Sequence, residues 1–255
     1  MSEQIEKGKQ TKLLEEVLII FLLFLCLVCL PFSSWIKDPY WVLFASIMAR
    51  VTFIVVSLCL LKPFGLSFSF LRETKKESLY CLPFLLLCGG NLLFLTTQGT
   101  FSPNTSVSLL LLQGVFALLV ALSEEILFRG VIETQLLKKM SPLFGILIAS
   151  LIFSLTHAVN FFSSSPLQVL LQMGYSFILG LFCGLSYYLS GSLLLPITIH
   201  FFFNFFAQYL FEFLNHQEIS PLYFILNVLV GGLLVGYGLC LFFVHERKKA
   251  KEIVD

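Results

Sequence analysis

Long apolar runs separated by short polar segments make up most of this sequence. We count about eight runs close to the roughly 20 residues that a helix needs to cross a bilayer. Prolines and serines lie between the runs, as expected of connecting segments. The pattern predicts an all-α fold, a polytopic membrane helical bundle, with residues 1–255 forming a single membrane domain. The predicted spans are Leu13–Leu30, Tyr40–Leu61, Leu79–Thr96, Ser106–Ser123, Leu143–Phe162, Leu167–Leu189, Leu193–Phe213 and Leu222–Val244.

Composition supports a membrane protein and excludes an ordinary soluble domain. The chain is 58% hydrophobic and 12% charged, with a mean hydropathy of +0.93, whereas soluble domains carry roughly 25% charged residues. The net charge is +1 and we find no basic face, so we expect no nucleic-acid partner. The seven cysteines show neither metal-ligand spacing nor a disulfide framework, which favours small buried apolar residues.

The N-terminal segment resembles a signal peptide, because lysines precede the apolar run Val17–Leu30. No small-residue cleavage site follows convincingly, so we expect a retained first helix. Fourteen of the 16 Lys and Arg residues fall on alternate loops, whereas Lys37 lies in an opposite loop and Arg50 within the second span. The positive-inside rule therefore predicts that both termini and the stretch Glu124–Lys139 are cytoplasmic. The 14 residues are Lys7, Lys9, Lys12, Lys62, Arg72, Lys75, Lys76, Arg129, Lys138, Lys139, Arg247, Lys248, Lys249 and Lys251.

Two adjacent glutamates and an arginine follow the apolar run Val107–Leu122. If the run continues as a helix, Glu125 and Arg129 are four residues apart and can form an ion pair. Glu124 then points about 100° away from Glu125, toward a different neighbour. A carboxylate in a membrane core usually faces protein or a water-filled cavity and usually has a function. The alternative is a helix end whose charges lie among lipid headgroups.

Further polar residues lie inside other apolar runs: His157 in the fifth span, and His200 and Asn204 in the seventh. His200 and Asn204 are four residues apart and share one helical face. One histidine in an apolar helix is usually only a hydrogen-bonded bundle residue. Polar groups on three helices must find partners within the membrane, and we expect them to find each other. For Arg50 we favour a structural ion pair inside the bundle over a role in substrate binding.

This set of residue types can hydrolyse an amide bond. A carboxylate can accept a proton from water as a general base, and a histidine can assist it. A second histidine and an asparagine amide can donate hydrogen bonds to the oxyanion that forms. Glu and two His could instead bind catalytic zinc, but the chain has no HExxH motif. We therefore expect neither metal nor cofactor.

Three motifs resemble those of the CPBP family of CAAX proteases and bacteriocin-processing or immunity proteins, also called Abi, which includes the Ras-converting CAAX endopeptidase. They are Glu124-Glu125-x-x-x-Arg129, Phe153-x-x-x-His157 and His200-x-x-x-Asn204, and the resemblance covers residues 106–208 as a catalytic core. It implies an intramembrane endopeptidase in which Glu124 and His157 activate water. The same resemblance implies that His200 and Asn204 form the oxyanion site, with Glu125 and Arg129 in support.

The resemblance leaves the substrate open. We expect a membrane-associated peptide or protein substrate, the lipid bilayer as surroundings, and a bacterial inner membrane as location. CAAX cleavage requires a prenylated C-terminal motif. A non-enzymatic immunity or scaffold protein and a transporter with a proton path are the alternatives. The predicted spans fit the site imperfectly, because Glu124 lies near the end of its span and His157 about 22 Å into its own.

Overall fold

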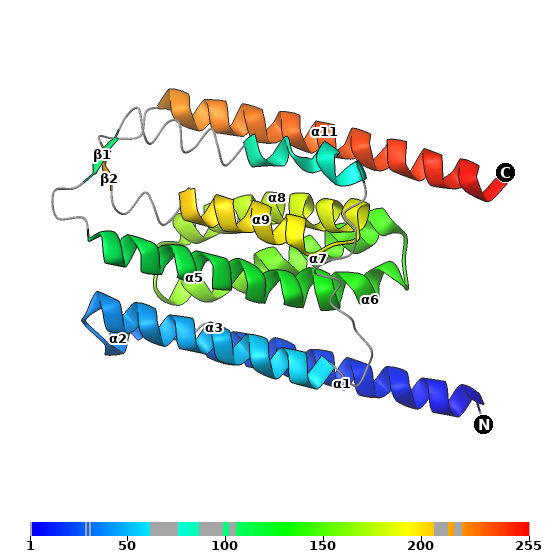
Figure 1. The fold of residues 1–255 in the computed structure, drawn as a ribbon, viewed down its shortest axis with the longest axis horizontal. Helices are drawn as coiled ribbons and strands as arrows, with labels where there is room; N and C mark the ends of the chain where they lie inside the picture. The colour runs from blue at the N-terminus through cyan, green and yellow to red at the C-terminus, as the bar shows by residue number, and fades with distance from the viewer. Residues whose placement is uncertain are drawn as a thin grey trace.

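The computed structural model describes residues 2–28, 30, 32–61, 76–86, 99–101, 106–206, 214–216 and 221–254, and these are overwhelmingly helical (Figure 1). The predicted all-α class is confirmed. A short antiparallel pair, β1 with β2, was not predicted. The elements are α1 (Ser2–Val28), α2 (Phe32–Trp35), α3 (Pro39–Leu61), η2 (Lys76–Cys81), β1 (Gly99–Phe101), α5 (Val107–Glu125), η3 (Ile126–Glu133), α6 (Thr134–Leu137), α7 (Pro142–Thr156), η4 (His157–Phe162), α8 (Pro166–Ser190), α9 (Leu194–Asn204), β2 (Leu214–His216) and α11 (Pro221–Val254).

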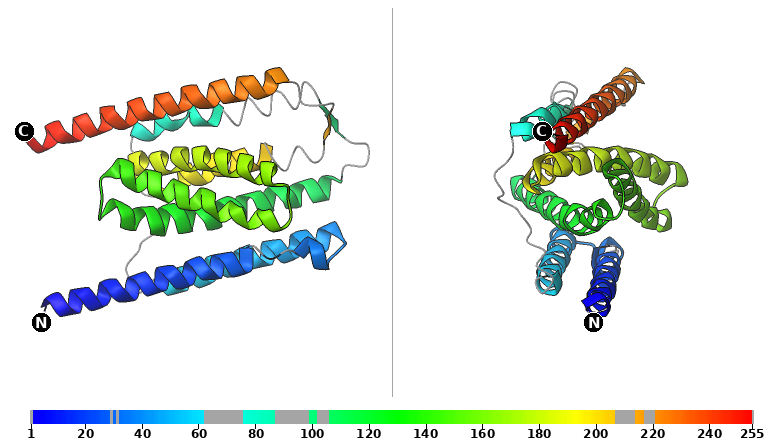
Figure 2. Two further views of the ribbon diagram at one scale, coloured as in Figure 1. Left: turned by 180° about the vertical axis from the view of Figure 1, so that it is seen from behind. Right: turned by 90° about the vertical axis from the view of Figure 1, so that its right-hand side faces the viewer.

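The long helices run roughly side by side in three groups. Figures 1 and 2 show α1 and α3 on one side, a central group of α5, α7, α8 and α9, and α11 with η2 on the other side. Both termini lie at the same end of the bundle, with α6. The opposite end holds the start of α5, the strand pair and the connection from α1 to α3.

Five described helical segments are long and apolar enough to cross a membrane, and they correspond to the second, fourth, fifth, sixth and eighth predicted spans. The protein is therefore an integral membrane protein. Most of the first predicted span, Leu13–Leu30, overlaps α1, and the seventh begins with the shorter apolar helix α9. Much of the third lies outside the described residues, so the count of eight stays a prediction. The five segments are Pro39–Leu60, Val107–Leu137, Pro142–Phe162, Pro166–Ser190 and Val228–Lys251.

Side chains at the helix ends explain where several helices begin and stop. Ser165 and Gln168 form a capping box at the start of α8, with a proline as its first residue. Gly191 ends this helix in the left-handed conformation, at a φ of 67°. Asp38 Oδ1 accepts hydrogen bonds from the backbone N–H groups of Tyr40 and Trp41 at the start of α3.

Two groups of buried apolar side chains hold the bundle together on either side of the centre. One joins α8 and α9 to η2 and α11, where Phe84 stacks on Phe182 at 4.6 Å between ring centroids. The other joins α1 and α3 to η3 and α7, where Phe24 contacts Phe53 and Phe128 edge-on. The polar residues of the three motifs lie beside this second group.

Candidate functional site

The helix that carries the glutamates continues well past them. α5 passes into η3, a π-helix, and then into α6, so that one apolar segment spans Val107–Leu137. The prediction that this span ends at Ser123 is wrong, because apolar residues alternate with the charged ones and keep the segment buried. Glu124 therefore lies 13 residues before the end of the segment at Leu137, and His157 lies 15 residues after the start of α7 at Pro142. The expected mismatch in depth between the two residues disappears.

The π-helix places the charges of the first motif inside the protein. The N–H of Thr134 reaches back five residues to the carbonyl of Arg129, and its hydroxyl donates to the same oxygen at 2.8 Å. Such segments are rare and are frequent at functional sites. Arg129 is 0% exposed, so its assignment to a cytoplasmic loop is also wrong. Lys138 and Lys139 beyond the segment are exposed, as expected of a loop.

Glu124 forms an ion pair with Arg50 of α3. Nη1 of Arg50 lies 2.9 Å from Oε1 of Glu124 and also donates to the Ser123 hydroxyl at 2.9 Å. The Arg50 guanidinium lies over the Phe24 ring, at 5.6 Å from its centroid. The ion pair predicted for Arg50 is thus confirmed, and it is made with the glutamate of greatest chemical interest.

One imidazole lies between the two adjacent glutamates. His200 Nδ1 is 2.7 Å from Oε1 of Glu125, and Nε2 is 3.7 Å from Oε2 of Glu124. His200 is 2% exposed, and its ring meets the Phe153 ring edge-on at 5.7 Å. The first and third motifs, which the sequence places on separate helices, are therefore in direct contact.

Glu125 also pairs with Arg129, as its spacing predicts. Nε of Arg129 lies 3.1 Å from Oε2 of Glu125 and 3.8 Å from Oε2 of Glu133, and all three side chains are fully buried. Nη2 of Arg129 donates to the Gly180 carbonyl at 2.8 Å, and the guanidinium lies over the Phe153 ring at 5.1 Å. Arg129 thus ties the glutamate helix to α7 and α8.

Two glycines of α8 allow this close packing. A Cβ at Gly180 would lie 3.0 Å from Cβ of Ser150, and one at Gly184 would lie 2.7 Å from Oε2 of Glu133. Small residues four apart are a common means of bringing membrane helices together. α8 can therefore approach α7 and η3 closely enough for its backbone to accept a bond from Arg129.

His157 and Asn204 complete the set at the ends of their helices. His157 follows the last residue of α7, with Nδ1 3.2 Å from the Phe153 carbonyl and its ring edge-on to Phe153 at 5.3 Å. Asn204 is the last residue of α9, one turn beyond His200, and is 9% exposed. The second motif thus supplies both a histidine and the phenylalanine that His157, His200 and Arg129 all contact.

A cavity of about 650 Å³ joins these residues. Glu124, His157, His200 and Asn204 all line it, whereas Glu125 and Arg129 lie behind its wall. The cavity wall also contains neutral polar side chains of η4 and α8, including Asn160, which donates to Gln172 at 2.7 Å. The arrangement separates residues that a bound molecule can reach from residues that hold them in place.

The metal alternative requires three ligands within reach of one ion. Within the described residues, which include Glu124, His157 and His200, no three His, Cys, Asp or Glu side chains form such a group. The donor set therefore does not fit a His₂Glu zinc site in this arrangement.

Sequence reasoning missed two contributions. Glu133 continues the four-residue spacing of Glu125 and Arg129, and this spacing is visible in the sequence. Because the predicted span ended at Ser123, Glu133 was expected in a loop. Phe153 appeared only as part of a motif, and no pattern along the chain could show that three polar side chains pack on its ring. Arg50 was recognised as an intramembrane charge, but its partner comes from a segment 74 residues away.

Comparison with known proteins supports the motifs. Residues 106–206 match the family model "Type II CAAX prenyl endopeptidase Rce1-like". The match begins at the residue that caps α5 and ends just after Asn204, so it contains all three motifs. Searches of the curated proteins and of the solved structures found no match.

Proposed function

Because residues 106–206 match the Rce1-like family model, we propose that this protein is an intramembrane endopeptidase that cleaves a membrane-associated peptide or protein through a glutamate-activated water. Glu124 is the general base, His157 assists it, and His200 with Asn204 stabilises the oxyanion. Glu125 and Arg129 are positioning residues. The support comes from the family match and from the shared cavity that joins these side chains.

Glu124 suits the role of base because it lines the cavity and is held at one oxygen only. Oε1 accepts from Arg50, and Oε2 lies on the side of His200 at 3.7 Å, a distance that leaves the oxygen accessible to water. A general base must lie within hydrogen-bond reach of the proton it removes. The contact with Arg50 prevents the carboxylate from rotating away from the cavity.

His200 suits the oxyanion site because of its contact with Glu125. An ionised Glu125 accepts the Nδ1 proton, which sets the orientation of the ring. When the ring carries both protons, Nε2–H faces the cavity and can donate to a developing negative charge. Asn204, one turn farther along α9, supplies an amide N–H as the second donor.

The reaction then follows from these positions. Water attacks the carbonyl carbon of the scissile peptide bond while Glu124 takes its proton, and the carbonyl oxygen becomes an anion facing His200 and Asn204. The C–N bond breaks, and the proton held on Glu124 passes to the departing amine. The products are a new carboxylic acid, which releases its remaining proton to solvent, and a new amine, and the enzyme returns to its starting state.

One observation carries the proposal: the conjunction of Glu124, His157, His200 and Asn204 on a single cavity wall. Its test compares peptides released from cells that express the wild type or Glu124→Gln. Gln keeps the size and the hydrogen-bonding capacity of Glu but cannot act as a base. We expect peptides that appear only with the wild type, at equal amounts of inserted protein. Identical peptide profiles together with an intact cellular phenotype would leave the immunity or scaffold alternative.

A further inference from the structure

The cavity occupies one half of the bundle along its length. Its lining residues on α1 come from the end of the helix, those on α8 from the first half, and those on α9 from the last part. The α5 residues, Val120 and Glu124, lie near the middle of the continuous segment Val107–Leu137 and mark the inner end of the cavity. Leu30, Ser33 and Ser163, which lie in or beside connecting segments, line it as well. Apart from the residues on α5, these positions lie toward the end of the bundle where α1 stops and α8 begins (Figure 2). The cavity therefore runs from mid-bundle toward that end.

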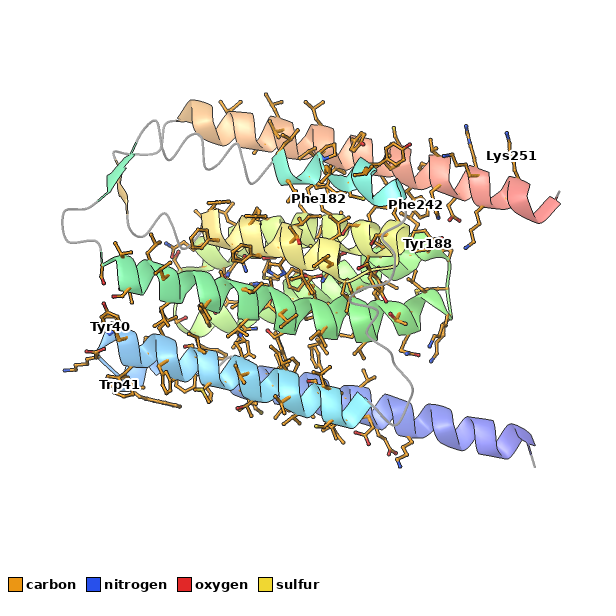
Figure 3. The ribbon with its side chains drawn as sticks, in the orientation of Figure 1. Tyr40, Trp41, Phe182, Tyr188, Phe242 and Lys251 are labelled. Carbon is orange, nitrogen blue, oxygen red and sulfur yellow. The ribbon has the colours of Figure 1, made fainter. Side chains whose placement is uncertain are left out.

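The basic residues lie at the other end. Lys138 and Lys139 follow α6, and the exposed Lys248, Lys249 and Lys251 lie in the last part of α11, close to the C-terminus (Figure 3). At the end toward which the cavity runs, the described connections carry one basic residue, Lys37. Basic loops remain in the cytoplasm during membrane insertion. The cavity end is therefore the end that the charge pattern places away from the cytoplasm.

Exposed aromatic side chains indicate where the cavity end of the bundle lies relative to the membrane surface. Trp35 is 65% exposed, Trp41 is 64% exposed, and Tyr40 beside it is 42% exposed. Figure 3 shows Tyr40 and Trp41 at the end of the bundle opposite Lys251. Tryptophan and tyrosine concentrate at the membrane–water interface. Phe162 on the cavity wall is 94% exposed and comes from the same end. The mouth of the cavity therefore lies near an interface and not deep in the hydrocarbon.

We propose that the active-site cavity opens on the non-cytoplasmic side of the membrane and takes peptide substrates presented from that side. The substrate class in this inference rests on the proposed function. The side on which the cavity opens rests on the geometry alone. A prenyl-anchored protein on the cytoplasmic leaflet would meet the end of the bundle opposite to the one toward which this cavity runs. The substrate class is instead a translocated peptide, or the non-cytoplasmic part of a membrane protein.

The rim of the cavity has chemistry suited to such a peptide. Asn160 and Gln172 form a hydrogen-bonded pair, Nδ2 to Oε1 at 2.7 Å, which leaves the Asn160 side-chain oxygen for a ligand, while the Gln172 side chain also bonds to Tyr175. Ser163 and Tyr175 add hydroxyl groups to the same wall. An extended peptide carries unpaired N–H and C=O groups that require partners as it leaves water. These neutral side chains can supply them without selecting for charge.

The test is thiol labelling of single-cysteine substitutions in intact cells. Two exposed positions, one before and one after α7, serve as matched controls for the two sides of the membrane. Ser163→Cys follows α7 and η4, Lys138→Cys precedes α7, and Gln172→Cys lies inside the cavity. Mass spectrometry of labelled peptides distinguishes these sites from the native cysteines. With a membrane-impermeant maleimide outside, we expect labelling at positions 163 and 172, and labelling at position 138 only after permeabilisation.

Two results would overturn the inference. Labelling at position 138 in intact cells would reverse the orientation, and labelling of position 172 only from the cytoplasmic side would reverse the opening. Because the readout needs no catalysis, it separates this inference from the proposed function. If labelling is as expected but the peptide comparison shows no difference, the opening is correct and the peptidase assignment is wrong.

Discussion

Arg50 and Glu124 form an ion pair at the cavity wall, with Nη1 of Arg50 2.9 Å from Oε1 of Glu124. The side chains are 10% and 9% exposed, so removing one partner leaves a largely desolvated charge on the other. Breaking a buried pair in this way is strongly destabilising, whereas removing both charges is often neutral. The pair therefore makes the stability of the bundle depend on the glutamate that we propose as the base.

Arg50→Gln should lower the free energy of unfolding by about 3 kcal/mol, because it leaves Glu124 unpaired. The double variant Arg50→Gln/Glu124→Gln should recover most of that loss and still cleave nothing. Thermal unfolding in detergent measures the first effect, and release of the identified peptide measures the second. Equal stability of the single and double variants would mean that the pair does not couple these residues.

His200→Ala and Asn204→Ala should each reduce kcat by roughly 10²–10³-fold, as expected for removal of an oxyanion donor. KM should change much less, because the oxyanion exists only in the transition state. Their double variant should be little worse than either single one if the two residues act as a unit. A rise in KM at constant kcat would assign them to substrate binding instead.

The carboxylates on either side of Arg129 should behave differently. Glu125 contacts both Arg129 and His200, so Glu125→Gln should reduce stability and activity together. Glu133 lies 3.8 Å from Arg129, and neither of its oxygens has a hydrogen-bond partner among the described residues. Glu133→Gln should therefore be neutral or stabilising, since removing a poorly paired buried charge relieves its desolvation. Unfolding temperatures compare the two variants directly.

Gly184→Ala should destabilise the protein by about 1–3 kcal/mol through overpacking, because its Cβ would lie 2.7 Å from Oε2 of Glu133. Gly174→Ala on the same helix is the control, since nothing lies within 4 Å of a Cβ there. The control should be neutral or slightly stabilising, because alanine favours helix. A combined Gly184→Ala/Glu133→Ala variant should regain stability if the clash with Glu133 is the cause.

Metal removal should leave activity unchanged. We expect protein treated with a chelator and exchanged into metal-free buffer to cleave its peptide at the original rate. Activity that disappears and returns with added zinc would require the ligands to rearrange, because the described residues hold no group of three within reach of one ion.

Local pattern was sufficient for the helices, their membrane context and the pairing of Glu125 with Arg129, because each depends on neighbours in the chain. Apolar runs of about 20 residues and a spacing of four residues carry that information directly. The three motifs were recognisable for the same reason, and all three lie within residues 106–206, which match the Rce1-like family model.

Contacts between helices were decided only by the tertiary structure. The spacing of Glu124 and Glu125 predicted different neighbours, but their partners Arg50 and His200 lie 74 and 75 residues away in the chain. The helix continues to Leu137 because η3 buries its charged side chains against α7 and α8. Hydropathy alone assigns a stretch with these charged residues to a loop, because it does not show that they are buried. The direction in which the cavity runs depends on which half of each helix lines it, and no single segment carries that information.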